Sequence, residues 1–272
     1  MGSEMCIRDS NSAGAAVERI ASVYHLKAQA NWLLEQRAGA IAVLDQATKI
    51  FPEDNSFLRR KVFFLIELGL YQDAAELGQR YLSLSAGSAD DYIAIGNALR
   101  QSGQIETALV FLETAQIKYP TNTTIKKVLA HTYIDQGSLH IAADIINDAA
   151  ITDPELLPEA AELYRRAGQV YRALSLNGEI LDQQAKFKQR LALLIELSRF
   201  EQAGGMETDL RRLGLLENED IRYALAFALF KSGEFDRAEQ HLSLLTRTDL
   251  FRKAIEVRRA IQDCEGSTWK CT

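Results

Sequence analysis

Residues 89–121 read ADDYIAIGNALRQSGQIETALVFLETAQIKYPT, and this stretch decides the fold. Its first half places Tyr92, Ile95 and Leu99 on one helical face, at the spacing i, i+3, i+7. Gly103 then predicts a stop, because glycine readily adopts the left-handed conformation that ends helices. A second apolar stripe follows, formed by Ile105, Ala108, Leu112 and Ala115. The stretch therefore predicts two antiparallel helices that are joined by a short turn, with Pro120 closing the second.

The same pattern recurs at a fixed interval. Gly69, Gly103 and Gly137 stand thirty-four residues apart, and each is followed five positions later by an alanine, namely Ala74, Ala108 and Ala142. A period of this size is typical of a solenoid, in which each repeat is too small to bury its own apolar face. After Ala142 the interval shortens, to 31 residues at Ala173 and to 30 at Ala203.

These residues support a resemblance to a known family. Tyr92-x2-Ile95-Gly96-x2-Leu99, Ala108-x3-Leu112 and Pro120 resemble the tetratricopeptide-repeat (TPR) pattern W-x2-L-G-x2-Y…A-x3-F…P. The resemblance implies an all-α fold: an α-solenoid in which antiparallel helix pairs stack into a right-handed superhelix. We expect the small residues Gly96 and Ala108 to let paired helices approach closely, since larger side chains would overpack the contact.

Seven such repeats are predicted over residues 15–246. Asn177-Gly178 and Gly204-Gly205 interrupt the second helices of the fifth and sixth repeats, since glycine disfavours a helix interior. Residues 247–264 are predicted to form a capping helix with a basic outer face. That basic face also suits an acidic partner or anionic lipid, although a solvated cap is the simpler interpretation. Residues 265–272 are expected to be a flexible tail.

The two ends of the sequence carry separate expectations. Residues 5–10 (MCIRDS) resemble the translation of a sequencing adapter, so residues 1–14 are interpreted as a non-native or disordered leader. Residues 7–263 contain no cysteine, whereas Cys264 and Cys271 lie close together in the tail. This pair is a possible disulfide, which would indicate an oxidising compartment such as the periplasm; the alternative is two free thiols. The sequence leaves the localisation open, with a slight preference for periplasmic over cytoplasmic.

Composition and motifs argue against several classes of function. The net charge is −6 with no dominant basic face, so nucleic-acid binding is not predicted. No apolar stretch approaches the eighteen residues of a membrane span. The four histidines form no H-E-x-x-H pair, and no C-x2-C motif, phosphate-binding loop or nucleophile elbow occurs. We therefore expect no catalytic residues, no metal, no cofactor and no small-molecule substrate.

The resemblance does imply a binding surface. In TPR proteins the first helices of successive repeats line a concave groove, and transfer of the groove positions to this sequence gives a set of nine residues. They are Arg59, Phe63, Asn97, Arg100, Lys127, His131, Arg165, Tyr223 and Phe227. Basic and polar residues in the middle with aromatic residues toward the ends favour an extended peptide of acidic character. The alternative to a binding role is interhelix packing for the aromatic residues, Trp32 included, and ordinary solvated charge for the others.

Three hypotheses follow for the function. The first is a non-enzymatic scaffold that binds a protein or peptide partner in the groove. The second is an assembly subunit of a bacterial envelope system for secretion, polysaccharide export or cell-wall synthesis, suggested by Cys264 and Cys271. The third is the interaction arm of a larger enzyme whose catalytic domain precedes this sequence. A chaperone-type carboxylate clamp is not predicted, because only Asn97 matches its pattern.

Overall fold

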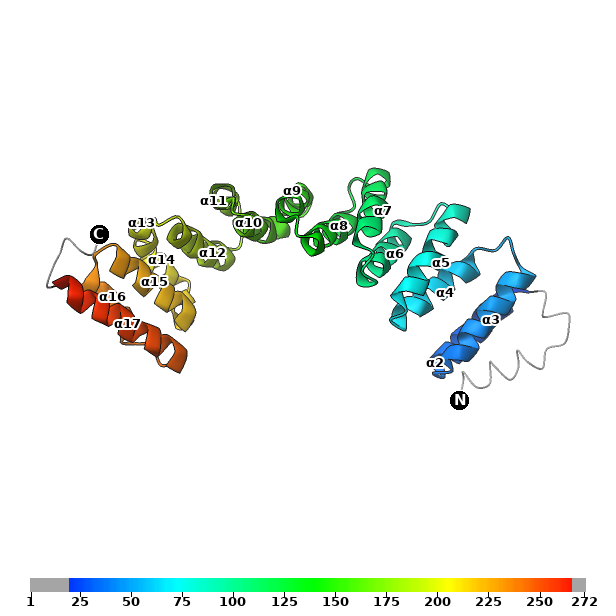
Figure 1. The fold of residues 1–272 in the computed structure, drawn as a ribbon, viewed down its shortest axis with the longest axis horizontal. Helices are drawn as coiled ribbons and strands as arrows, with labels where there is room; N and C mark the ends of the chain where they lie inside the picture. The colour runs from blue at the N-terminus through cyan, green and yellow to red at the C-terminus, as the bar shows by residue number, and fades with distance from the viewer. Residues whose placement is uncertain (1–19, 266–272) are drawn as a thin grey trace. The chain divides into compact units, whose positions relative to one another are not determined.

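The computed structural model describes residues 20–265, which form helices joined by short turns, with no strand among them (Figure 1). The all-α fold of paired helices is therefore confirmed. Residue contacts divide the chain into two compact units, with the division between Gln136 and Gly137. We call them the N-terminal unit and the C-terminal unit. The predicted leader at residues 1–14 lies outside the described residues, as does Cys271; Cys264 falls in the last helix, and its side chain is not described.

The N-terminal unit is a series of helices packed in sequence order. They are α2 (Ala21–Leu33), α3 (Arg37–Ile50), α4 (Ser56–Glu67), α5 (Tyr71–Leu84), α6 (Ala89–Gln101), α7 (Ile105–Lys118) and α8 (Thr123–Gln136). Each helix packs against the next, and in addition α4 packs against α6 and α6 against α8. The first helices of successive pairs, α4, α6 and α8, therefore form one row, which we call the first-helix row.

Local sequence explains the ends of these helices. Gly103 ends α6 with a φ of 79°, and Gly69 ends α4 with a φ of 73°, as the repeat spacing predicts. Ser88 begins α6 with a capping box, in which its hydroxyl accepts from the Asp91 N–H while the Asp91 carboxylate accepts from the Ser88 N–H. Between these ends, Leu99 lies in the core of the unit. The pattern of residues 89–121 thus fixes both the turn and the buried face.

The C-terminal unit continues the series with shorter second helices. It contains α9 (Leu139–Ala150), α10 (Leu157–Arg166), α11 (Val170–Asn177), α12 (Gln183–Glu196), α13 (Phe200–Gly204), α14 (Glu207–Arg212), α15 (Glu219–Lys231), α16 (Phe235–Leu242) and α17 (Thr248–Glu265), with 3-10 turns at Pro154–Leu156 and Leu215–Glu217. Helix α11 ends at Asn177, and Gly205 separates α13 from α14. Both predicted interruptions are confirmed.

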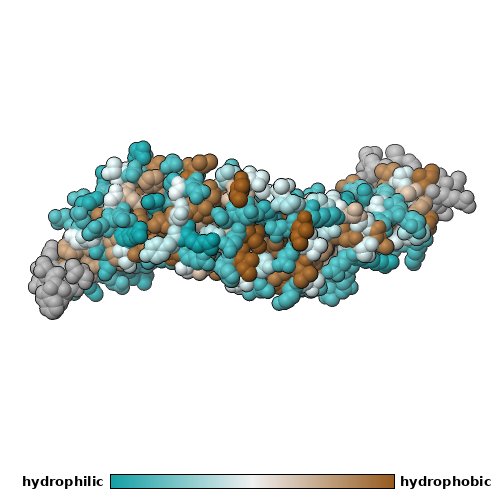
Figure 2. Space-filling view, turned by 90° about the horizontal axis from the view of Figure 1, so that it is seen from above, coloured by the Kyte–Doolittle hydropathy of each residue, from teal (hydrophilic) through white to brown (hydrophobic). Residues whose placement is uncertain are grey.

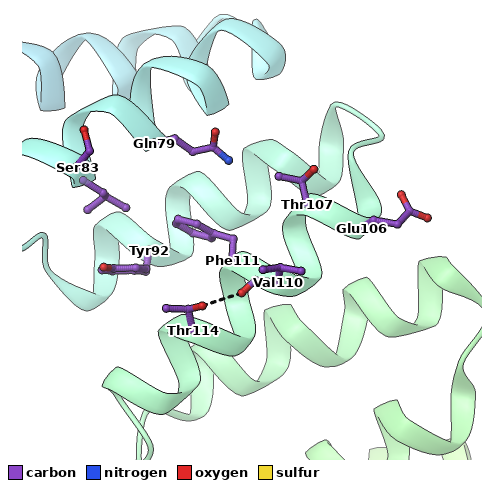
Figure 3. Close-up of a pocket in the computed structure, with 9 residues that line it drawn as sticks. Gln79, Ser83, Tyr92, Glu106, Thr107, Val110, Phe111 and Thr114 are labelled. Atoms are coloured by element: carbon purple, nitrogen blue, oxygen red, sulfur yellow. Dashed lines mark hydrogen bonds between the residues drawn. The ribbon is translucent and has the colours of Figure 1, made fainter.

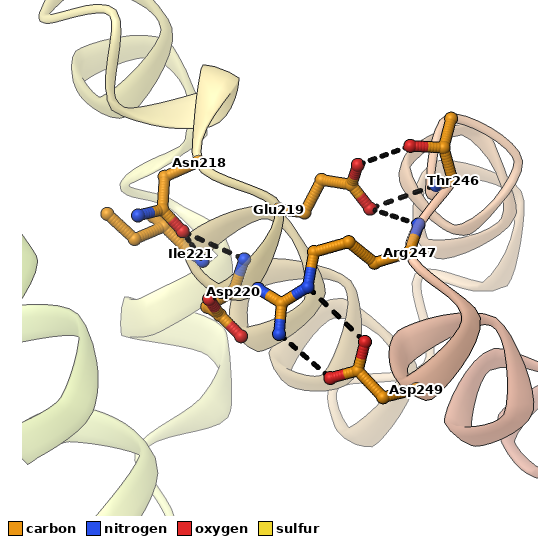
Figure 4. Close-up of polar contacts among 7 residues, drawn as sticks. All are labelled: Asn218, Glu219, Asp220, Ile221, Thr246, Arg247 and Asp249. Carbon is orange, nitrogen blue, oxygen red and sulfur yellow. Dashed lines mark hydrogen bonds and ion pairs between the residues drawn. The ribbon is translucent and has the colours of Figure 1, made fainter.

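The capping helix α17 docks through a polar network at its start (Figure 4). The Glu219 carboxylate accepts hydrogen bonds from the N–H and hydroxyl of Thr246 (2.9 and 2.5 Å) and from the N–H of Arg247 (3.0 Å). The Arg247 guanidinium binds Asp220 at 2.5 Å and Asp249 at 2.8 Å. Beyond this network, Leu250 and Ile261 of α17 enter the hydrophobic core of the unit. The predicted C-terminal cap is therefore present.

Candidate functional site

Two of the predicted groove arginines link neighbouring helices of the first-helix row. The Arg59 Nε on α4 lies 2.6 Å from Asp91 Oδ1 on α6, and the Arg100 Nη1 on α6 lies 2.9 Å from Asp135 Oδ2 on α8. Each bond joins residues about one repeat apart in sequence, with separations of 32 and 35. These two arginines are therefore paired with acidic groups from the same chain.

Asp91 organises the first of these links. Its side chain is 2% exposed and accepts hydrogen bonds from the Ser88 N–H at 2.8 Å, the Arg59 guanidinium and the Tyr81 hydroxyl at 3.2 Å. Burial by itself raises the pKa of Asp91, but the bonds from Ser88 and Arg59 outweigh it and hold that pKa below its usual value. Asp91 thus stays ionised, both capping α6 and fixing Arg59.

The remaining predicted residues of the N-terminal unit lie on the same three helices. The Arg59 guanidinium sits 4.9 Å from the centroid of the Phe63 ring, one turn along α4. Asn97, half-buried on α6, makes no hydrogen bond through its side chain within the described residues. Lys127 and His131 lie on α8 together with Asp135. The first-helix row thus carries six of the nine predicted residues, with a free amide between two ion pairs.

The other three predicted residues belong to the C-terminal unit and make internal contacts there. Arg165 on α10 binds Glu162 at 2.7 Å and Glu196 on α12 at 2.9 Å. The Phe227 ring lies 6.1 Å from the ring of Phe200, a side chain that packs against the core of this unit. Tyr223 has the Lys253 ammonium 5.8 Å from its ring. The structure therefore distributes the predicted set over two units, and these three side chains also hold helices together.

Trp32, which sequence left undecided between groove and packing, is a packing residue. It is 7% exposed, and its ring stacks on that of Phe64 at 3.8 Å between centroids. The indole Nε1–H donates to Glu67 at 2.9 Å, and the Arg37 guanidinium covers the ring at 4.2 Å. The buried aromatic surface of Trp32 therefore stabilises the contact between the first two repeats and is not offered to a partner.

A second feature of the N-terminal unit was not predicted. An open groove of about 710 Å³ lies between the second helices α5 and α7, over Tyr92 of α6 (Figure 3). We call it the α5–α7 groove, defined by the lining residues Gln79, Leu82, Ser83, Tyr92, Glu106, Thr107, Val110, Phe111 and Thr114. A signal for it exists in the sequence. The run from Leu109 to Leu112 is apolar throughout, and four successive positions cannot all face the core of one helix.

No group of three or more His, Cys, Asp or Glu side chains among the described residues is placed to hold a metal ion. On the face seen in Figure 2, apolar side chains form patches within a mostly hydrophilic surface. None of the described helices is long and apolar enough to cross a membrane.

Comparison with known proteins gives one family match and many structural ones. A family model described as tetratricopeptide repeat matches residues 21–54, which contain α2 and α3. The C-terminal part of a TPR repeat-containing protein from Cytophaga hutchinsonii is similar over 85% of this chain and 97% of its own, with a TM-score of 0.65 and 16% identity. No curated protein matches the sequence.

Two further solved structures resemble a smaller share of the chain. YrrB, described as a TPR protein with an unusual peptide-binding site, is similar over 61% of this chain and 87% of its own, with a TM-score of 0.50 and 17% identity. MamA from Desulfovibrio magneticus RS-1 is similar over 60% of this chain and 93% of its own, with a TM-score of 0.51 and 19% identity. At these identities the likeness concerns the fold.

Proposed function

We propose that this chain, which matches the tetratricopeptide-repeat model over residues 21–54 and has a fold similar to that of TPR proteins, is a non-enzymatic scaffold that binds a protein or peptide partner along its first helices. A role in protein interaction follows from the repeat fold, in which stacked helix pairs expose a long, regular surface. YrrB, which shares this fold, is described as having a peptide-binding site. The finer parts of the proposal are the surface and the chemistry of the partner.

One observation supports the first-helix row as that surface. The side-chain amide of Asn97 makes no hydrogen bond within the described residues. It lies on α6, the helix that also carries Arg100, whose guanidinium is paired with Asp135. An asparagine amide both donates and accepts, so it suits the backbone of a bound peptide. Phe63 adds an apolar anchor on α4, where the Arg59–Asp91 pair orients the guanidinium over its ring. We propose Asn97 and Phe63 as the centre of the contact.

The ion pairs refine the expected chemistry of the partner. Asp91 and Asp135 already neutralise Arg59 and Arg100. An acidic partner therefore gains less from these arginines than unpaired charges would provide, because it competes with a carboxylate that is in place. We propose a partner segment of mixed character, in which an apolar side chain contacts Phe63.

The proposal is tested by measuring how much partner is captured by a variant in which two basic residues of the first-helix row are replaced by glutamate. We expect Arg100→Glu combined with Lys127→Glu to reduce capture of the wild-type partners from an extract of the source organism by about tenfold. The melting temperature should change little, because partly exposed ion pairs such as Arg100–Asp135 contribute about 0–1 kcal/mol. Partners are identified by mass spectrometry and quantified by immunoblot.

A matched control carries the same change in charge on second helices of the same unit. Lys49→Glu with Arg80→Glu alters exposed residues of α3 and α5 and should leave capture at the wild-type level. Undiminished capture by the Arg100/Lys127 variant would contradict the assignment of the surface.

Two narrower functions remain alternatives within the proposal. Cys264 and Cys271 favour an envelope assembly subunit, which predicts a disulfide in protein from its native compartment. Non-reducing mass spectrometry decides between that bond and two free thiols. The interaction arm of a larger enzyme is tested by recovering the genomic reading frame upstream of Ser10.

A further inference from the structure

We propose that the α5–α7 groove is a second docking site, which receives an amphipathic helix of a partner protein carrying apolar residues on one face and a lysine or arginine beside them. This site lies on second helices and is independent of the first-helix row. Its volume of about 710 Å³ holds several side chains.

The floor of the groove is apolar and firmly held. The Tyr92 and Phe111 rings stack with 5.3 Å between centroids, and Leu82 of α5 completes the lining opposite α7. Val110 stands at the edge with 67% of its surface exposed, although it is a large aliphatic residue. Covering these side chains would remove apolar area from water, which favours a partner with aliphatic or aromatic residues.

The backbone on both sides limits the form of the occupant. Helices α5 and α7 use their interior N–H and C=O groups within their own turns, so the walls offer no edge to an extended peptide. An extended segment would leave its own backbone groups without partners over the apolar floor. A helix satisfies its backbone internally and packs its side chains into the groove between two others. The geometry therefore points to a helical occupant.

The charge of the groove selects the polar residues of that helix. Glu106 is the one formal charge among the lining residues. Its side chain, together with those of Gln79 and Thr107, makes no hydrogen bond or ion pair within the described residues. Lys118 on the same helix is already bound to the Ala86 carbonyl and the Tyr92 hydroxyl. The rim therefore presents one free carboxylate and two free polar groups, which a basic residue and a neutral polar residue complement.

The test uses the full chain and three labelled sixteen-residue helical peptides in fluorescence anisotropy. The first carries leucine on one face, with lysine along the edge of that face, in an alanine host; the second replaces lysine with glutamate; the third scrambles the first. We expect the lysine peptide to bind about tenfold more tightly than either of the others. Glu106→Lys should reverse the preference between the lysine and glutamate peptides. Nonspecific electrostatic binding to an acidic protein would leave that preference unchanged.

Two matched variants separate the groove from the rest of α7. Val110→Ser should weaken binding of the lysine peptide about fivefold, while Ile117→Ser, at 83% exposure and outside the lining, should leave it unchanged. Asn97→Ala should also leave it unchanged, since that residue belongs to the first-helix row. Equal binding of all three peptides, or equal loss in the Ile117 variant, would overturn the proposal. Self-association of the wild type that Val110→Ser abolishes would likewise overturn it, because the occupant would then be a second copy.

Discussion

Single residues of this chain act mainly by joining repeats, and a buried ionisable cluster on α14 and α16 shows how. His241 on α16 is 4% exposed, with its Nε2 3.4 Å from the Glu207 carboxylate. Glu207 also accepts from Arg237 at 2.7 Å and is paired with Arg211 at 2.5 Å. Burial lowers the pKa of His241, and the Glu207 carboxylate offsets this effect only in part, while Arg222 and Arg211 add to it. The neutral imidazole is therefore the form that the fold prefers.

This preference predicts how stability depends on pH. An unfolded histidine takes up its proton near pH 6.5, whereas His241 in the folded protein does so at lower pH. Below about pH 6.5 the unfolded state binds more protons, so stability falls with falling pH until the folded pKa is passed. We expect His241→Gln to flatten the dependence of the free energy of unfolding between pH 7 and pH 5, as measured by urea denaturation. His140→Gln, at an exposed position, is the control, and the same slope in both variants would contradict the assignment.

At the scale of helices, the close approach of neighbours depends on glycine. A Cβ added at Gly78 would lie 2.5 Å from Ile95 Cγ1, and one at Gly96 would lie 2.9 Å from Leu112 Cγ. Side chains of the facing helices thus occupy the space in which a methyl group would stand. The expectation that Gly96 allows two helices to approach closely is confirmed.

A pair of alanine substitutions measures this contact. Alanine is favoured over glycine in helices by about 1 kcal/mol, yet Gly96→Ala should destabilise the protein by about 1–3 kcal/mol through overpacking. Gly205→Ala should be neutral or stabilising, because its nearest atoms, the Glu201 and Gln202 carbonyl oxygens, lie at ordinary distances of 3.4 and 3.5 Å. Urea denaturation of both variants gives the comparison. A Gly96 variant as stable as the wild type would show that α6 and α7 adjust freely.

The elements also show what sequence predicts and what it does not. The turn at Gly103, the break at Gly204-Gly205 and the capping helix follow from local rules, since glycine conformation and apolar spacing act within a few residues. The α5–α7 groove depends on how three helices pack, which local rules do not give. Apolar spacing indicates only that one residue of the run from Leu109 to Leu112 must be exposed, and in the structure Val110 is exposed.

The ion pairs of the first-helix row are partly predictable from the sequence. Arg59 and Asp91, like Arg100 and Asp135, are opposite charges separated by about one repeat, a signal that sequence contains. Because Asp91 and Asp135 pair with Arg59 and Arg100, the row is less positive than these arginines alone indicate. A charge at one repeat should therefore be compared with the equivalent position of the next before a ligand is inferred.

For the whole molecule, sequence predicts an unbroken series of repeats, whereas the contacts divide the chain at Gly137, inside the fourth repeat. The third glycine of the thirty-four-residue series thus coincides with a division that periodicity does not reveal. It also separates six predicted binding residues, on α4, α6 and α8, from three in the other unit. The central claim therefore concerns the N-terminal unit: that its first-helix row binds a protein partner.

Site-specific photo-crosslinking at position 97 tests that claim most directly. A photoreactive phenylalanine replaces Asn97 in one variant and Ile117, on the second helix α7, in another, and both are irradiated in the source organism. We expect a discrete adduct with a protein or peptide at position 97 and none of the same mass at position 117. Absence of any adduct at position 97, or the same adduct at both positions, would contradict the account.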